Sequence, residues 1–161
     1  EKLAGCLQFL KQAGLIDNTD DPQTTEYVKR VINLAADRLR VFGDVFQLDE
    51  FFVDDQQLPY DEKNFQKRVI KPEAALDLLR ELRNELQCSA DFRAEPLHQL
   101  VQDFVTRKSI KAGDLFPALR LCVTGKAQGT DLFATLELLG QERVIRRIDY
   151  SMGVAESSRA N

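Results

Sequence analysis

The residues best suited to ligand binding lie in LFPALRLCVTGKAQGTDLF, residues 115–133. This stretch places Arg120 in an apolar run, follows it with a loop containing Gly125 and Gly129, and then opens a new helix. A helix N-terminus presents backbone N–H groups without intrahelical acceptors, and such groups bind anions or base acceptor atoms. A planar guanidinium suits bidentate recognition of a base edge or a phosphate. The stretch predicts a recognition corner or, in a plainer interpretation, an arginine paired with an acid beside glycines that only turn the chain.

Other kinds of chemistry find little material in this chain. The GKAQG run differs from a P-loop, because Lys126 follows its first glycine and no β-strand precedes it, which excludes nucleotide hydrolysis. His98 is the only histidine, and we expect it on a helix surface. The acid pairs Asp20-Asp21 and Asp54-Asp55 lie in turn-like polar segments, where we expect solvated side chains without basic partners. We therefore expect no catalytic residue in this chain.

The three cysteines are too dispersed for a metal site. Cys6, Cys88 and Cys122 lie far apart in the sequence and have no nearby histidine at metal-ligand spacing. We expect all three to be buried, reduced thiols and predict no bound metal.

Charge is unevenly distributed along the chain. The net charge of −4 argues against a protein that coats nucleic acid indiscriminately. Residues 44–62 contain seven acids and no Lys or Arg. The last third gathers Arg107, Lys108, Lys111, Arg120, Lys126, Arg143, Arg146 and Arg147. A polyanion would be repelled by the first region and attracted to the second.

The elements that must position these residues are helices. Leu, Ala, Glu, Gln, Arg and Lys dominate, while Gly and Pro are sparse, so the composition predicts an all-α protein. Apolar periodicity and capping residues predict helices at residues 3–13, 25–42, 72–88, 95–105, 115–124, 131–139 and 141–148. The expected caps are Thr24 or Thr25 for the second helix, Asp114 for the fifth and Thr130 for the sixth. The expected terminators are Gly14, Gly43, Gly125 and Gly140.

A composition change near residue 65 predicts two small helical subdomains packed together. The expected boundaries are residues 1–65, residues 66–151, and a flexible tail at 152–161. No apolar run is long enough to cross a bilayer and no signal peptide is apparent, so we expect a soluble, cytoplasmic protein without membrane contact.

Four segments of the chain resemble a known family. They are LKQAGL, INLAADRLRVFGDVFQLDEFFVDD, YDEKNFQK and AGDLFPALRLCVTGKAQGTDLFATLELLGQERVIRRI. Together they resemble the C-terminal anticodon-binding region of bacterial-type glutamyl-tRNA synthetase, a class I synthetase, up to about residue 150. The resemblance implies an α-helix-cage-like module that grips the anticodon of glutamate tRNA during protein synthesis.

The resemblance also implies what lies outside this sequence. The family's catalytic core, with its ATP and magnesium sites, has no counterpart here, so the fragment should need no cofactor and should not activate glutamate by itself. Its implied partners are glutamate tRNA and its own catalytic core, in a monomer that does not bind DNA. Whether glutamine tRNA is also charged stays open.

The resemblance assigns roles to individual positions. Arg120 matches an arginine that reaches an anticodon base, and Pro117 lies at a neighbouring contact position. Gly129, Thr130 and Leu132 match the loop and helix start that shape the pocket for the third anticodon nucleotide. Many relatives have Pro where this chain has Thr130, which changes the rigidity of the loop.

Other positions have more open assignments. Arg38 is the candidate for a second base-reading arginine, with Arg40 as the alternative. Lys126, Arg143 and Arg146 are candidate phosphate contacts, and Arg147 is either a fourth or a buttress of the last helix.

A second function class is a helical protein-interaction module that does not bind RNA. It would use the same corner, with Phe51 and Phe52 as a docking patch. Salt dependence separates the two classes, because RNA binding weakens steeply as salt rises and apolar docking does not.

Overall fold

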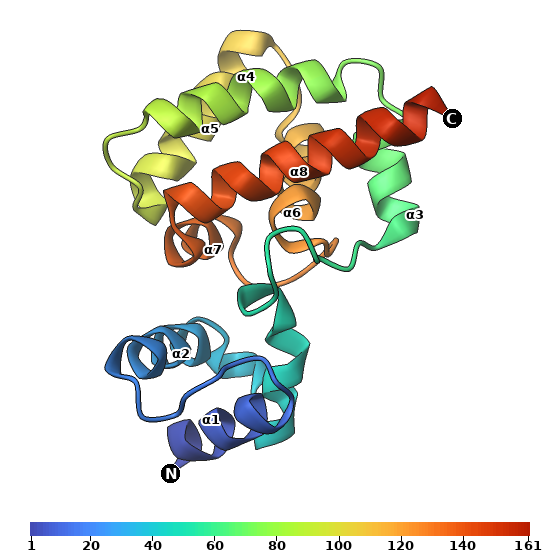
Figure 1. Cartoon of the computed structure of the whole chain (residues 1–161). Helices are drawn as coiled ribbons and strands as arrows, with labels where there is room; N and C mark the ends of the chain where they lie inside the picture. The colour runs from blue at the N-terminus through green and yellow to red at the C-terminus, as the bar shows by residue number, and fades with distance from the viewer. The chain divides into compact units, whose positions relative to one another are not determined.

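The computed structural model describes residues 1–161 and contains helices but no β-strand, which confirms the all-α fold class. The chain forms two compact units, Glu1–Asp54 and Asp55–Asn161 (Figure 1). The sequence predicts this division after residue 65. The difference has a physical reason, because Asp55 is bound by side chains of the last helix and so belongs to the second unit.

The first unit is built from short helices. Its elements are α1 (Lys2–Gln12), α2 (Pro22–Leu34), the 3-10 turn η1 (Ala36–Arg38) and the 3-10 segment η2 (Phe42–Phe51). Asp21, and not Thr24 or Thr25, caps α2: its carboxylate accepts a hydrogen bond from the backbone N–H of Thr24 at 2.7 Å. The carboxylate of Asp21 is thus a helix cap and not a solvated turn group.

The predicted long helix at 25–42 is wrong, because α2 ends at Leu34. The Asp44 carboxylate accepts the backbone N–H groups of Arg40 and Val41 at 2.7 and 2.9 Å. A continuing helix would have directed those groups to its own carbonyls, so the side chain competes with the helix. Leu39 is nevertheless buried, as the apolar stripe predicts.

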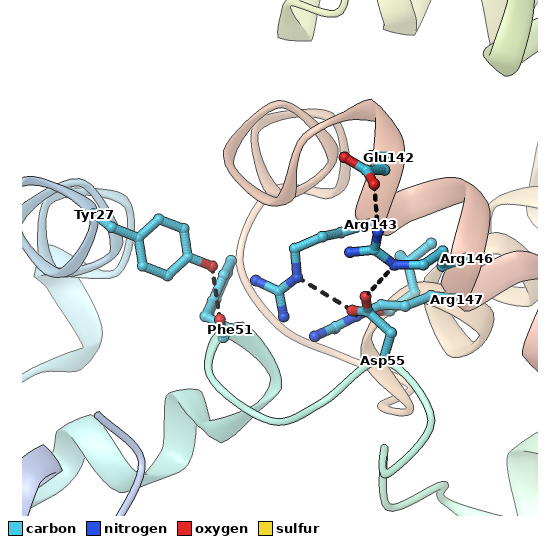
Figure 2. Close-up of polar contacts among 8 residues, drawn as sticks. Tyr27, Phe51, Asp55, Glu142, Arg143, Arg146 and Arg147 are labelled. Atoms are coloured by element: carbon cyan, nitrogen blue, oxygen red, sulfur yellow. Dashed lines mark hydrogen bonds and ion pairs between the residues drawn. The ribbon is translucent and has the colours of Figure 1, made fainter. Parts of the chain in front are cut away.

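Phe51 belongs to the core of the first unit. Its side chain is fully buried, and its carbonyl accepts a hydrogen bond from the Tyr27 hydroxyl at 2.7 Å (Figure 2). Phe52 is half-buried and packs edge-on against Tyr27. The expected Phe51-Phe52 docking patch is therefore wrong, since Phe51 offers no side-chain surface to a partner.

The second unit surrounds its core with longer helices. Its elements are α3 (Glu62–Phe65), the π-helical turn η3 (Gln66–Ile70), α4 (Ala75–Cys88), α5 (Ala94–Lys108), α6 (Ala112–Thr124), α7 (Leu132–Leu139) and α8 (Gln141–Ala160). Helix α8 packs along α4 and also contacts α6 and α7, while α5 packs on α7 (Figure 1). The predicted inward residues of α4, Leu76, Leu79, Leu82 and Leu86, are all buried.

Helix α8 continues beyond the predicted range. The sequence predicts a flexible tail from residue 152, whereas α8 runs to Ala160 with Met152 and Ala155 buried. These residues extend the stripe of Ile148 by four and seven positions, which keeps them on the same helix face. Near the end of α8, the Arg159 side chain donates hydrogen bonds to the carbonyls of Ile70 and Pro72.

One carboxylate ties α8 to the start of the second unit. Asp55 accepts hydrogen bonds from Nε of Arg143, Arg146 and Arg147 at 3.2, 2.9 and 2.7 Å (Figure 2). Its side chain is only 11% exposed, so the expectation of a solvated turn is wrong for Asp55. Burial favours the protonated carboxyl, but hydrogen bonds from Arg147 and Arg146 outweigh it and lower the pKa of Asp55. We call these four residues, with Glu142 bonded to Arg146, the Asp55 cluster.

The remaining reactive groups lie apart from one another. Cys6 and Cys122 are buried as expected, and burial raises the pKa of Cys122 to about 12. Cys88 is exposed at the end of α4, so the expectation of a buried thiol is wrong for it.

The structure contains no group of three or more His, Cys, Asp or Glu that could hold a metal ion. None of its helices combines the length and the apolar character needed to span a membrane.

We predict opposite effects of adding one methyl group at two glycines. Gly125 has φ +75°, and a Cβ there would lie 2.5 Å from the Pro59 carbonyl oxygen. Gly125→Ala should lower the free energy of unfolding by about 2 kcal/mol. Gly153 lies within α8 with open space around it, so Gly153→Ala should raise that free energy by about 0.5 to 1 kcal/mol. Urea unfolding of both variants measures the difference, and equal effects would contradict this account of Gly125.

We also predict a pH-dependent effect at Asp55. Asp55→Asn leaves the buried Arg147 without its carboxylate and should reduce stability by about 3 kcal/mol at pH 7. Because the folded-state pKa of Asp55 is lowered, its contribution is complete above the unfolded pKa of about 3.9 and is lost as pH falls through the folded value. The difference in unfolding free energy between wild type and variant, measured by urea unfolding, should therefore begin to narrow below about pH 4 and close as the pH falls past the folded-state pKa. Asp54→Asn, at an exposed neighbour, is the control, and a gap between wild type and Asp55→Asn that stays constant down to pH 2 would contradict the prediction.

Candidate functional site

The α6–α7 corner consists of Arg120 and the loop residues 125–131. Helix α6 ends at Gly125, whose N–H donates to the carbonyl of Leu121 at 2.8 Å, as the sequence predicts. The Gly125 carbonyl accepts the N–H of Asp61 at 2.7 Å, so the corner is anchored to the residues that precede α3. The close approach to Pro59 leaves room only for glycine at this position.

Asp131, and not Thr130, caps α7. The Asp131 carboxylate accepts the N–H of Ala134 at 2.8 Å. Thr130 is buried, and its hydroxyl lies 2.8 Å from the hydroxyl of Thr135. Since the single proton of Thr135 goes to the carbonyl of Asp131 at 2.7 Å, Thr130 is the donor of this pair. Two hydroxyl hydrogen bonds, from Thr130 to Thr135 and from Thr135 to the carbonyl of Asp131, hold this loop against the start of α7.

Arg120 spans the corner. Its side chain is half-buried, and Nη1 donates to the carbonyl of Thr130 at 2.8 Å. The same nitrogen is the nearest atom to a Cβ built on Gly129, at 3.2 Å. The structure therefore brings together three predicted site residues, with the guanidinium beside a position that carries no side chain.

Pro117 lies on the face of α6 that carries Arg120, because the two are three residues apart. It is half-buried and has no N–H, so the carbonyl of Gly113 lacks its usual helical donor. Arg68 donates to this carbonyl from Nη1 at 3.4 Å. Leu132, the first residue of α7, has a buried side chain, which leaves its backbone as the part that could contact a ligand.

Lys126 and Arg38 occupy different units. Lys126 is half-buried in the corner loop, where its N–H donates to the Thr124 hydroxyl at 3.1 Å. Arg38 is exposed at the end of η1, in the first unit. Arg40 is exposed as well, so exposure does not distinguish these two candidates.

The candidate phosphate contacts of α8 belong to the Asp55 cluster. Arg146 keeps 52% of its side chain exposed and Arg143 keeps 26%, whereas Arg147 is fully buried. Arg147 also donates to the carbonyl of Val123 at 2.7 Å, which makes it a buttress between α8 and the end of α6. With three arginines and two carboxylates, Asp55 and Glu142, the cluster retains a net positive charge.

Two residues of this region were not predicted. Asp55 follows another acid in a segment without helical periodicity, and no local pattern connects it to arginines roughly 90 positions later. Thr135 has the appearance of an ordinary helical residue, although its spacing of five from Thr130 places the two hydroxyls near one helix start. Of these two residues, only Thr135 could have been found from the sequence, through its spacing from Thr130.

A family model and several known proteins match most of this chain. The family model described as the anticodon binding domain matches residues 3–152. A glutamate–tRNA ligase of Moorella thermoacetica is 33% identical over 143 residues, covering 89% of this chain and 29% of that protein. A glutamate–tRNA ligase of a Roseiflexus species is 33% identical over 160 residues, covering 92% of this chain and 29% of that protein. The chain thus spans under a third of the length of these curated relatives.

Solved structures agree on the fold. A glutamate tRNA ligase from Elizabethkingia meningosepticum superposes with a TM-score of 0.79 at 24% identity, covering 94% of this chain and 28% of that one. At this identity the likeness establishes the arrangement of helices and not the function. Because the family model matches nearly the whole chain, including the α6–α7 corner, the chain belongs to the anticodon binding domain family.

Proposed function

We propose that this chain is the anticodon-recognising part of a glutamate–tRNA ligase and that its α6–α7 corner reads an anticodon base. The observation that carries the proposal is the position of Arg120, whose guanidinium is held by the Thr130 carbonyl beside Gly129. A guanidinium oriented in this way can direct further N–H groups at a base edge. The absence of a side chain at Gly129 leaves room for this guanidinium beside the backbone of the loop.

Local charge supports RNA as the ligand. Reading a single-stranded loop requires bases that are splayed out, stacked and hydrogen-bonded on their edges, so a basic cleft is enough and a basic protein is unnecessary. Lys126 lies in the same loop as Gly129, and we propose it as a phosphate contact. Arg143 and Arg146 remain candidates for the same role, because their cluster keeps a net positive charge despite Asp55.

We propose that glutamate is attached to tRNA by a part of the protein that lies outside this chain. The curated relatives carry the name glutamate–tRNA ligase, and this chain covers about 29% of their length. We propose that ATP and magnesium bind in that remaining part, on which this chain packs, and that the protein acts in the cytoplasm as a monomer. Arg38 or Arg40 would supply a second base contact from the first unit.

We predict that Arg120→Ala weakens binding of a glutamate tRNA anticodon stem-loop by about 1 to 3 kcal/mol and relaxes discrimination at one nucleotide. Arg120→Lys keeps the charge without the planar fork, so it should recover part of the affinity and little of the discrimination. Binding titrations against stem-loops substituted at each anticodon position measure both quantities.

The control for this experiment is Arg80→Ala. Arg80 is a half-exposed arginine of α4, paired with Asp77 and Glu156, and its removal should leave anticodon discrimination unchanged. Circular dichroism verifies that each variant is folded. An equal loss on every stem-loop with Arg120→Ala would rule out base reading by this residue.

A phosphate contact should behave differently. Lys126→Ala should weaken all stem-loops alike and reduce the slope of log affinity against log salt by about 1. Gln128→Ala changes an exposed, uncharged side chain of the same loop and should leave the slope unaltered. Titrations between 50 and 200 mM salt, a range over which phosphate contacts change affinity by orders of magnitude, provide the slopes. An unchanged slope with Lys126→Ala would remove Lys126 from the interface.

A further inference from the structure

Three aromatic rings from three helices meet at the surface of the second unit. The imidazole of His98 on α5 stacks on the ring of Phe133 on α7, with centroids 4.5 Å apart and planes inclined by 23°. Phe116 on α6 meets Phe133 edge-on at 5.4 Å and His98 at 6.4 Å. We call these three residues the aromatic platform.

The platform adjoins the α6–α7 corner. Phe116 and Arg120 are four residues apart on α6 and therefore neighbours on one helix face. Phe133 is the second residue of α7, directly after the loop whose Thr130 carbonyl binds Arg120. The Arg120–Thr130 hydrogen bond and the Phe116–Phe133 ring contact both join α6 to the start of α7. They begin on the same face of α6, about one helical turn apart.

His98 is the part of the platform that faces solvent. Phe133 is only 7% exposed and Phe116 is half-buried, whereas His98 is exposed. The imidazole makes ring contacts with the two phenylalanines, and its nitrogens form no hydrogen bond with the protein. One face of the ring lies against Phe133, and the residue as a whole is exposed.

We propose that a nucleobase of the RNA loop, adjacent to the base read by Arg120, stacks on the outer face of His98 and continues the stack that Phe133 begins. This inference rests on the proposed function. Aromatic side chains bind single-stranded bases through their π-faces, and every base has such a face. The platform therefore contributes affinity without selecting base identity, and Arg120 contributes the selection.

The experiment uses the 161-residue chain and glutamate tRNA anticodon stem-loops. His98→Ala removes the ring from an exposed helix position and should raise Kd about tenfold, the size expected for losing one stacked base. His98→Tyr keeps a flat ring and should stay within about twofold of wild type. Gln102→Ala, which changes an exposed residue one turn further along α5, is the matched control and should have no effect.

Stem-loops with an abasic nucleotide at each loop position in turn locate the stacked base. At one position the abasic change should weaken binding to wild type about tenfold and leave binding to His98→Ala almost unchanged. A stem-loop with 2-aminopurine at that position should lose fluorescence on binding wild type and regain it with His98→Ala.

The outcomes separate this inference from the proposed function. If wild type binds and discriminates anticodons while His98→Ala binds equally well and no abasic position couples to it, the stacking proposal is overturned and the function stands. If His98→Ala lowers only the melting temperature, His98 is a cover for Phe133 and the proposal is overturned as well. If wild type fails to bind the stem-loops, both fall.

Discussion

The second unit depends on keeping one buried guanidinium charged and paired. Arg147 is the largest fully buried side chain of the chain. A charged guanidinium is stable in the interior only when acceptors on the protein bind its N–H groups. Asp55 supplies the negative charge and the Val123 carbonyl supplies a second acceptor. Three segments far apart in the sequence are thereby joined, namely the segment of Asp55, the end of α6 and α8. The loop of the α6–α7 corner begins two residues after Val123, so its position depends on this contact.

The corner itself is arranged before any ligand arrives. The Thr130 carbonyl orients Arg120, while the hydroxyls of Thr130 and Thr135 hold the loop that carries this carbonyl. Rotamer freedom that is already lost in the unbound protein does not have to be lost on binding. The RNA binding that we propose would therefore need only a few oriented donors and small residues, which is compatible with a net charge of −4.

In the functions that we propose, the aromatic platform and Arg120 would recognise RNA through two kinds of interaction. Hydrogen bonds from a guanidinium depend on base identity, because each base edge has its own donors and acceptors. Stacking on His98 would depend on the presence of a base and little on its kind. Phe116 and Arg120 lie on successive turns of α6, and His98 on α5 contacts Phe116, so α6 links the two kinds of interaction.

The sequence by itself determined the all-α class, the apolar stripes of α4 and α6, and the glycines that end α6 and α7. These features are local, since helical periodicity and left-handed caps depend on residues within a few positions. It also indicated Arg120, Gly129 and Thr130, because a loop of this length must bring them near one another. Only the tertiary structure decided that Asp55 is a buried partner of three arginines, that α2 stops at Leu34, that α8 reaches Ala160, and that His98 covers Phe133. Each of these outcomes depends on contacts with side chains or elements elsewhere in the chain, and local periodicity carries no information about such partners.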